Sequence, residues 1–398
     1  IFTTRYKVAK ADLPAGTYRN VVGNYALSMG LAAAAERSKL GLFYGGYPIT
    51  PASDILHTLS AWKHLGIKTF QAEDEIAGIT SVLGAAFTGD LGITATSGPG
   101  IALKGEAMGL AVMAELPIVI INVQRGGPST GLPTKTEQSD LMQAMYGRNG
   151  EAPVPVLASS TPGDCFFVAY EACRIAVKYM TPVILLTDGY LANGSEPWQV
   201  PKVADLPDFD VSFADESNLA DGQFLSYSRD KKTLARPWAI PGTPGLEHRI
   251  GGIETEDLTG NVSYDPDNHH YMVETRAKKV EAITNEIGPS EIFGNKSGEL
   301  LILSWGGTKG ACRSATEALK ADGKKVSHLH LRWINPFPKD LGEKLIKFKH
   351  ILIPEINYGQ LIKIIRAEFL VDAQGLNQVR GKPISSSDIQ DAANKLIG

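Results

Sequence analysis

The chain has 398 residues, of which 43% are hydrophobic and 21% are charged, a composition typical of a globular protein with two or three domains. The formal net charge is only -4 and the basic residues form no runs, which argues against a nucleic-acid-binding protein. No apolar stretch reaches the roughly eighteen residues that a membrane-spanning helix needs. We therefore expect a soluble, cytoplasmic protein that contacts neither nucleic acid nor membrane.

Three cysteines, Cys165, Cys173 and Cys312, are scattered along the chain and form no Cys-x-x-Cys pair. We expect neither a disulfide framework nor an iron–sulfur cluster that this chain could hold alone. Because the first residue is isoleucine rather than methionine, we also expect that a segment precedes residue 1 in the complete protein.

Between residues 20 and 200, short apolar runs alternate with helical stretches. This alternation is typical of βαβ units, and it predicts an α/β fold with a mostly parallel sheet and helices on both faces. The expected strands are Leu40–Tyr44, Ile67–Phe70, Gly92–Thr96, Pro117–Val123, Val154–Ala158 and Pro182–Thr187. The expected helices are Tyr25–Arg37, Glu75–Phe87, Leu103–Ala114 and Pro162–Met180.

The periodicity stops between Glu196 and Asp267, where prolines, glycines and acidic residues predict a long connector that is ordered only if it packs on another element. A helix over Tyr271–Ile287 then leads into a second α/β block. Its expected strands are Leu300–Trp305, Val326–Arg332 and Ile351–Pro354. We predict a tail over 1–19, a first domain over 20–200, a connector with its helix over 201–290, and a second domain over 291–398.

Three acidic residues, Glu73, Asp74 and Glu75, stand together at the start of an expected helix. For any one of them the commoner explanation is that it complements the helix dipole, which contributes about 0.3–1 kcal/mol. The alternative is that one carboxylate, flanked by apolar helix, is desolvated and held protonated or shared with a heteroaromatic nitrogen. Both interpretations remain open for Glu75.

Two further segments end expected strands, which is where α/β enzymes bind their ligands. The first is Tyr47-Pro48-Ile49-Thr50-Pro51, in which Pro51 favours an extended Thr50 and so fixes its hydroxyl at the strand's end. Thr50 has the alternative role of capping the helix that begins near Ser53 or Asp54. The second is Ser97-Gly98-Pro99-Gly100, a loop that brings backbone close to a ligand, although short glycine loops are common.

Arg125 follows an almost entirely apolar strand, and its guanidinium is suited to bind a carboxylate in a sheltered crevice. The competing explanation is a structural ion pair with Glu137 or Asp140. Lys135 and Arg148 add positive charge nearby, more than a monocarboxylate would need.

Other candidate sites are weaker. His328 and His330 share one face of an expected strand, but two ligands without a third favour structural histidines over a metal site. Asp265, Asp267, His269 and His270 are a similar case, and His248 lacks a nearby nucleophile. No GxGxxG follows a first strand and no GxxxxGK[ST] occurs, which disfavours a dinucleotide-binding or P-loop enzyme.

Together, Tyr47–Pro51, the Glu75 helix, Thr96–Gly100 and Arg125–Thr134 resemble the α subunit of 2-oxoacid:ferredoxin oxidoreductases. The resemblance continues through Thr187-Asp188-Gly189, Ser304-Trp305-Gly306, Asn335-Pro336-Phe337-Pro338 and Glu355–Leu361, and it covers nearly the whole chain from Asn20. Within the family, Tyr146–Glu151 and Asp188–Asn193 are most similar to the 2-oxoglutarate enzymes. The implied fold is a thiamine-diphosphate-enzyme pyrimidine-type domain followed by a transketolase C-terminal-like α/β domain.

The resemblance implies a thiamine diphosphate enzyme that oxidatively decarboxylates 2-oxoglutarate, forms succinyl-CoA from CoA, and passes electrons to ferredoxin. By the family's pattern, Glu75 contacts the aminopyrimidine ring and supports formation of the ylid by general acid–base catalysis. Thr50 and Arg125 match the positions that hold the substrate's 1-carboxylate. As a hypothesis, Thr134, Lys135 or Arg148 receives the second carboxylate, unless the partner chain does. Residues expected beside the cofactor are Tyr47, Pro48, Ile49, Ser97 and Gly98.

The chain also lacks a diphosphate-binding GDG motif with its asparagine, and it lacks a cysteine cluster. The resemblance therefore implies that a β subunit supplies Mg²⁺ and the 4Fe-4S cluster, shares the thiamine diphosphate and completes an (αβ)₂ enzyme. A γ domain is sometimes fused ahead of the α region. Two alternatives stay open: the same chemistry on pyruvate or on a branched-chain or aromatic 2-oxoacid, and a non-catalytic scaffold for a thiamine-binding β chain.

Overall fold

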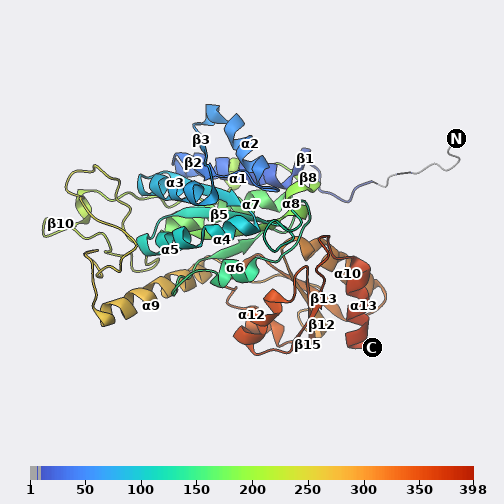
Figure 1. Ribbon diagram of the computed structural model, residues 1–398. Coiled ribbons are helices and arrows are strands. Elements are labelled where there is room, and N and C mark those ends of the chain that lie inside the picture. The colour runs from blue at the N-terminus through green and yellow to red at the C-terminus, as the bar shows by residue number, and fades with distance from the viewer. Residues whose placement is uncertain (1–6, 8–9) are drawn as a thin grey trace.

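The computed structural model describes residue 7 and residues 10–398, so most of the predicted tail lies outside the described residues. A seven-stranded sheet forms the first unit (Figure 1). In spatial order its strands are β14 (Trp333–Asn335), β6 (Val156–Ala158), β7 (Val183–Asp188), β5 (Ile118–Gln124), β4 (Leu91–Thr96), β2 (Leu42–Gly46) and β3 (Lys68–Gln71). All neighbours are parallel except β14, which runs antiparallel to β6.

Helices cover both faces of this sheet because its central strands are buried on both sides. All seven residues of β5 are buried, and Val119 and Ile121 pack against one set of helices while Ile118 and Ile120 pack against the other. The first set is α1 (Gly23–Ser38), α2 (Ser53–Ala61) and α7 (Asp164–Tyr179). The second set is α3 (Glu75–Phe87), α5 (Gly105–Ala114) and α6 (Leu141–Tyr146). This arrangement confirms the predicted α/β fold.

A second unit, drawn in orange and red in Figure 1, is built on a five-stranded sheet. Its strands, in spatial order, are β11 (Ile292–Phe293), β13 (Val326–Leu331), β12 (Gly298–Trp305), β15 (Phe348–Glu355) and β16 (Ala373–Asn377). Its helices are α10 (Lys309–Ala321), α11 (Leu341–Leu345), α12 (Gln360–Phe369) and α13 (Ser386–Ile397). Because β14 leaves this unit to join the first sheet, the two units share a strand as well as a core.

The long connector is held against the ends of α3 and α5. Trp238 Nε1 donates to Ala86 O at 3.0 Å, and Tyr227 OH donates to Met113 O at 3.2 Å. The segment contains β9 (Leu219–Ala220) and β10 (Gln223–Phe224) and begins with β8 (Ser195–Gln199), which pairs with β1 (Tyr18–Val22). The connector is therefore ordered by packing on the helix ends, as the sequence required.

Several predicted boundaries were wrong. The stretch predicted as a glycine loop is the first turn of α4 (Gly98–Leu103), because Pro99 is tolerated there. The helix predicted from Leu103 instead restarts after Lys104. The helix predicted from Tyr271 begins earlier, as α9 (Pro266–Ala282), because the Asp265 side chain accepts from Asn268 N and Pro266 occupies the first turn. The remaining short helix is α8 (Gly189–Asn193). Within the described residues, no helix is long and apolar enough to cross a bilayer.

Candidate active site

The predicted site residues come from neighbouring strands of the first sheet. Strands β5, β4 and β2 lie side by side and parallel, so the residues that follow them emerge at one edge (Figure 1). Thr50 follows β2, Ser97 follows β4 and Arg125 follows β5, whereas Glu75 opens α3 directly after β3. This is the edge at which α/β folds bind ligands.

The three acidic residues at the start of α3 differ in their surroundings. The sequence left open whether each one stabilises the helix end or serves as a functional carboxylate. Asp74 is the N-cap, and its carboxylate accepts from Ala77 N at 2.7 Å. Glu73 is exposed, whereas Glu75 is 8% exposed and its carboxylate accepts no hydrogen bond from the described residues. Since Asp74 already caps the helix, the Glu75 carboxylate is free to serve another group.

Gly100 permits a close approach to Glu75. A Cβ atom at this position would lie 1.8 Å from Thr96 Oγ1 and 2.8 Å from Glu75 Cγ, both too near for any larger residue. The glycine in the first turn of α4 therefore brings backbone directly against the Glu75 side chain. The sequence signalled the glycine but not this contact.

Lys104 is a site residue that the sequence reasoning missed. It lies between α4 and α5, is 0% exposed, and its Nζ donates to the backbone carbonyl of Glu75 at 2.7 Å. Burial lowers the pKa of Lys104 to about 8, although the carboxylates of Glu75 and Asp74 act in the opposite direction. A lysine inside an otherwise apolar helical stretch was the available signal.

Arg125 joins two of the predicted segments. Its Nη1 donates to Thr50 O at 2.6 Å, the residue is 6% exposed, and Nε is buried without a partner. Burial lowers the pKa of Arg125, while Asp140 and Glu75 act to raise it. No ion pair within 4.0 Å joins it to Glu137 or Asp140 among the described residues. The guanidinium thus keeps donors for a ligand.

The turn that carries Thr50 is fixed from behind. Asn24 Nδ2 donates to Pro51 O at 2.8 Å, which anchors the turn to α1. Thr50 does not cap α2, because the N-cap residue is Ala52. Thr50 and Thr134 instead line one pocket of about 330 Å³, together with Asn193.

The other predicted residues lie at different depths. Tyr47 is exposed and Pro48 and Ile49 are half-buried, while Ser97 is fully buried with an unpartnered Oγ. Gly98 approaches Asp140, whose carboxylate would lie 3.3 Å from a Cβ there. The exposed Lys135 packs against Gly381 of the second unit.

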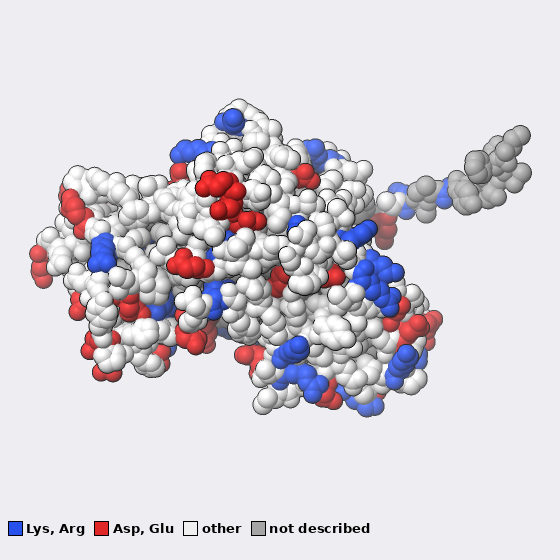
Figure 2. Space-filling model, in the orientation of Figure 1, with Lys and Arg blue, Asp and Glu red and all other residues white. Residues whose placement is uncertain are grey.

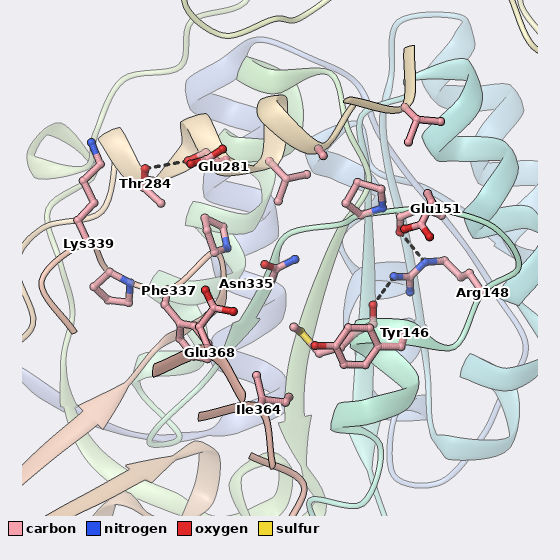
Figure 3. A pocket seen from close by; sticks show the side chains of 18 of the residues that line it. Tyr146, Arg148, Glu151, Glu281, Thr284, Asn335, Phe337, Lys339, Ile364 and Glu368 are labelled. Atoms are coloured by element: carbon pink, nitrogen blue, oxygen red, sulfur yellow. Dashed lines mark hydrogen bonds between the residues drawn. The ribbon is translucent and has the colours of Figure 1, made fainter. Parts of the chain in front are cut away.

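Arg148 belongs to a different hollow, of about 720 Å³ (Figure 3). Its three guanidinium nitrogens donate to Ala152 O, Ala144 O and Met145 O at 2.8–3.0 Å. Burial lowers the pKa of Arg148 to about 10. These three hydrogen bonds hold the turn after α6. Arg148 could bind a substrate carboxylate only if its guanidinium gave up these hydrogen bonds.

The remaining candidates have structural partners. His328 Nε2 and His330 Nδ1 both contact Ser304 Oγ, at 2.7 and 2.8 Å. His269 Nδ1 lies 2.6 Å from Glu254 Oε2. In the described part of the chain, no group of three or more His, Cys, Asp or Glu side chains could hold a metal ion.

The residues at the sheet edge suit the aminopyrimidine half of thiamine diphosphate. They offer an unpaired buried carboxylate at Glu75, an unpartnered hydroxyl at Ser97 and the close backbone approach at Gly100. A carboxylate can share a proton with a ring nitrogen, and glycine backbone lets a flat ring approach closely. The diphosphate half would need a metal site, which these residues do not provide.

Fold and site together define an α/β protein whose first unit is a thiamine-diphosphate-binding domain. Residues 37–264 match the family model described as pyruvate flavodoxin/ferredoxin oxidoreductase, thiamine diphosphate-binding, and residues 298–389 match pyruvate:ferredoxin oxidoreductase core domain II. The chain belongs to this family of 2-oxoacid:ferredoxin oxidoreductases, which confirms the resemblance seen in the sequence.

Among the relatives, the 2-oxoglutarate oxidoreductase subunit KorA of Mycobacterium tuberculosis is 52% identical over 98% of this chain and 59% of its own length. The 2-oxoglutarate synthase subunit KorA of Archaeoglobus fulgidus is 34% identical over 81% of this chain and 84% of its own. This chain thus spans little more than half of the first relative.

Among solved structures, the 2-oxoglutarate:ferredoxin oxidoreductase of Magnetococcus marinus, with 2-oxoglutarate, coenzyme A and succinyl-CoA bound, superposes with a TM-score of 0.90. It is 34% identical, and the match covers 96% of this chain and 66% of that one. A transketolase of Campylobacter jejuni, 13% identical with a TM-score of 0.54, shares the fold alone.

Proposed function

We propose that this chain is the α subunit of a cytoplasmic, thiamine diphosphate-dependent 2-oxoglutarate:ferredoxin oxidoreductase. The enzyme would convert 2-oxoglutarate and CoA to succinyl-CoA and CO₂ and pass the electrons to ferredoxin. The observation that carries the proposal is the buried Glu75 carboxylate, which is released from helix capping by Asp74 and left without a donor among the described residues. Support for the substrate comes from the names of the relatives and from the ligands of the Magnetococcus marinus structure.

Each residue of the site has a separate task. Thiamine diphosphate, when bound, supplies the nucleophilic carbon for cleaving the bond between C1 and C2 of the 2-oxoacid. The Glu75 carboxyl holds a proton at the aminopyrimidine ring, and Gly100 keeps its side chain in place. Arg125 and Thr50, already joined by a hydrogen bond, position the 1-carboxylate.

Thr134 and Lys135 would bind the second carboxylate of 2-oxoglutarate. Thr134 lines the pocket that Thr50 also lines, and Lys135 is its exposed neighbour. A threonine hydroxyl and an ammonium group suit a carboxylate that remains near solvent. Arg148 could also bind this carboxylate only if its three hydrogen bonds to backbone carbonyls broke.

A β subunit would complete the enzyme as (αβ)₂, and the naming of the relatives as subunits supports such a partner. It would bring Mg²⁺ for the diphosphate and the 4Fe-4S cluster for electron transfer. A γ domain, fused or separate, would complete the assembly.

The direct test is anaerobic ferredoxin reduction by this chain co-expressed with its β subunit. Assays with CoA would offer 2-oxoglutarate, pyruvate and 2-oxoisovalerate in parallel. We expect a preference for 2-oxoglutarate, expressed as kcat/KM. Preference for another acid would contradict the assignment of Thr134 and Lys135 to the second carboxylate. The roles of Glu75 and Arg125 would not be affected. An assembled complex that turns over none of the three acids would contradict the proposal.

A further inference from the structure

A further cavity, of about 590 Å³, lies mainly in the second unit, away from the site described above. It is lined by residues of β13, of β11 and of the start of α10. The segment leading into β11 and residue Ser160 of the first unit also line it. Its size is that of a small-molecule site.

The charged residues that line this cavity are mostly basic. They are Lys309, Arg313 and Arg332, with one acidic residue, Glu291. Arg332 is paired with Asp164, and Arg313 Nε donates to Glu317 Oε1 at 2.7 Å while its guanidinium lies over the Phe293 ring. On the face drawn in Figure 2, acidic and basic side chains are interspersed, and basic side chains gather near the end of the molecule where α10 lies.

Lys309 is the cation with the least compensation. Within the described residues no carboxylate lies within 4.0 Å of its Nζ, which instead donates to Ser160 Oγ at 3.1 Å. It is also the first residue of α10, whose first turn contains no acidic residue. Helices favour negative charge at this end, so a lysine there without a counter-ion suits a bound anion.

The two histidines in the lining are neutral hydrogen-bonding groups. Burial and the charges of Arg313 and Lys309 lower the pKa of His328 to about 3, and burial holds the pKa of His330 well below its usual range. Ser304 Oγ has one hydrogen for two ring nitrogens, so one histidine must donate to it and the other accept. The Nε2 atom of His330 is left buried without a described partner. These groups add hydrogen-bonding capacity without adding negative charge.

We propose that this cavity binds a phosphorylated small molecule, with Lys309 and Arg313 holding the phosphate. The two side chains stand four residues apart and so lie on one face of α10. A metal is disfavoured, because the lining offers two neutral histidines among three cations and a single carboxylate. The cavity is separate from the Glu75 site, but its test on the assembled enzyme, with CoA as one probe, rests on the function proposed above.

Isothermal titration of the assembled α–β enzyme would test this site with three probes: inorganic phosphate, ADP and CoA. The key variant is Lys309→Gln/Arg313→Gln, whose side chains are half-buried and exposed, so that folding is preserved. A matched control is Lys325→Gln/Lys395→Gln, which removes the same charge from two exposed positions of the second unit. We expect saturable binding of at least one probe, weakened at least tenfold in the key variant and unchanged in the control.

A third variant sharpens the test. Glu291→Gln removes the one carboxylate of the lining and should tighten binding severalfold. Tight binding of phosphate alone would identify the phosphate group as sufficient. Binding of ADP or CoA but not phosphate would show that the rest of the molecule contributes, and comparison of these two probes would separate a nucleotide from the co-substrate. Absence of saturable binding by all three, or equal binding by the key variant, would overturn the proposal.

Discussion

Two buried glutamates, one at the edge of each sheet, differ in how their charge is satisfied. Glu355, at the end of β15, is 0% exposed and accepts from Trp305 Nε1, Asn357 Nδ2, Leu361 N and Ile362 N at 2.9–3.3 Å. Glu75 is almost as buried but accepts from none of the described residues. A buried carboxylate with four donors is a structural element, whereas the Glu75 oxygens keep their hydrogen-bonding capacity for solvent or a ligand.

The contrast extends to the neighbours of the two carboxylates. Around Glu355 two of the four donors are backbone N–H groups at the start of α12, so the glutamate fixes that helix on its sheet. Around Glu75 the neighbouring groups are Lys104 Nζ, which donates to the backbone instead, and Gly100, which has no side chain. The hydrogen-bonding capacity of Glu355 is thus satisfied within the protein, whereas that of Glu75 is available to a ligand.

Glu75→Gln should have the largest effect. The change removes the proton-transferring group, and general acid–base catalysis contributes about 10²–10⁴-fold, so we expect kcat to fall by about that factor. Unfolding and assembly with the β subunit should stay unchanged, because no described hydrogen bond is lost. Ferredoxin reduction and size-exclusion chromatography would measure both. Full activity in an assembled complex would favour the scaffold interpretation.

Lys104→Met should alter the pH dependence of stability. The folded pKa of Lys104 is about 8 against an ordinary 10.5, so below pH 8 the lysine is charged in both states and its burial opposes folding. As the pH rises from 8 to 10.5, the folded state loses this proton first and the wild type gains stability, by up to about 3 kcal/mol. The variant should lack this gain. Urea unfolding of both proteins across this range would check it, and a constant difference would contradict the lowered pKa.

Glu355→Gln should lower stability without acting on chemistry. The amide keeps one oxygen but turns an NH₂ group toward backbone donors, which we expect to cost about 1–3 kcal/mol. The midpoint of urea unfolding should fall, while kcat of the assembled enzyme stays within about twofold. A loss of kcat comparable with that of Glu75→Gln would abolish the distinction between the two glutamates.

Arg125→Lys should have the smallest effect of the four. Lysine keeps the charge but loses the planar fork that can bind a carboxylate with two bonds, so we expect KM for the 2-oxoacid to rise about tenfold. The bond to Thr50 O would also weaken. Initial rates at varied 2-oxoacid would measure the change. An unchanged KM would remove Arg125 from the substrate site.

The sequence predicted those parts of the site that follow from the strand-end rule. Arg125 and Thr50 were selected because each follows an apolar run, and the sheet order then brings them together although they are 75 residues apart. Glu75 was selected as one of three acids, but only the structure shows Asp74 as the cap. Whether these residues bind the cofactor and substrate stays a prediction.

The rest depended on contacts that local patterns do not contain. Lys104 reaches a carbonyl 29 residues away, and Asn357 binds Gln138 O across 219 residues. The sequence placed Arg148 as added positive charge near Arg125, and only the structure shows that its guanidinium bonds to its own turn. The boundaries of the predicted domains likewise stay predictions, and β14 crosses between the two sheets.

That crossing strand also covers the edge of the first sheet in the finished protein. Without β14, strand β6 would present an open edge of unpaired backbone groups, the template on which sheets aggregate. The edge is closed only when residues 333–335 have emerged from the ribosome, long after β6 itself. A chain cut between the two units would therefore keep every predicted site residue yet expose an unpaired, aggregation-prone edge at β6. The second unit thus keeps the first sheet from pairing with other chains.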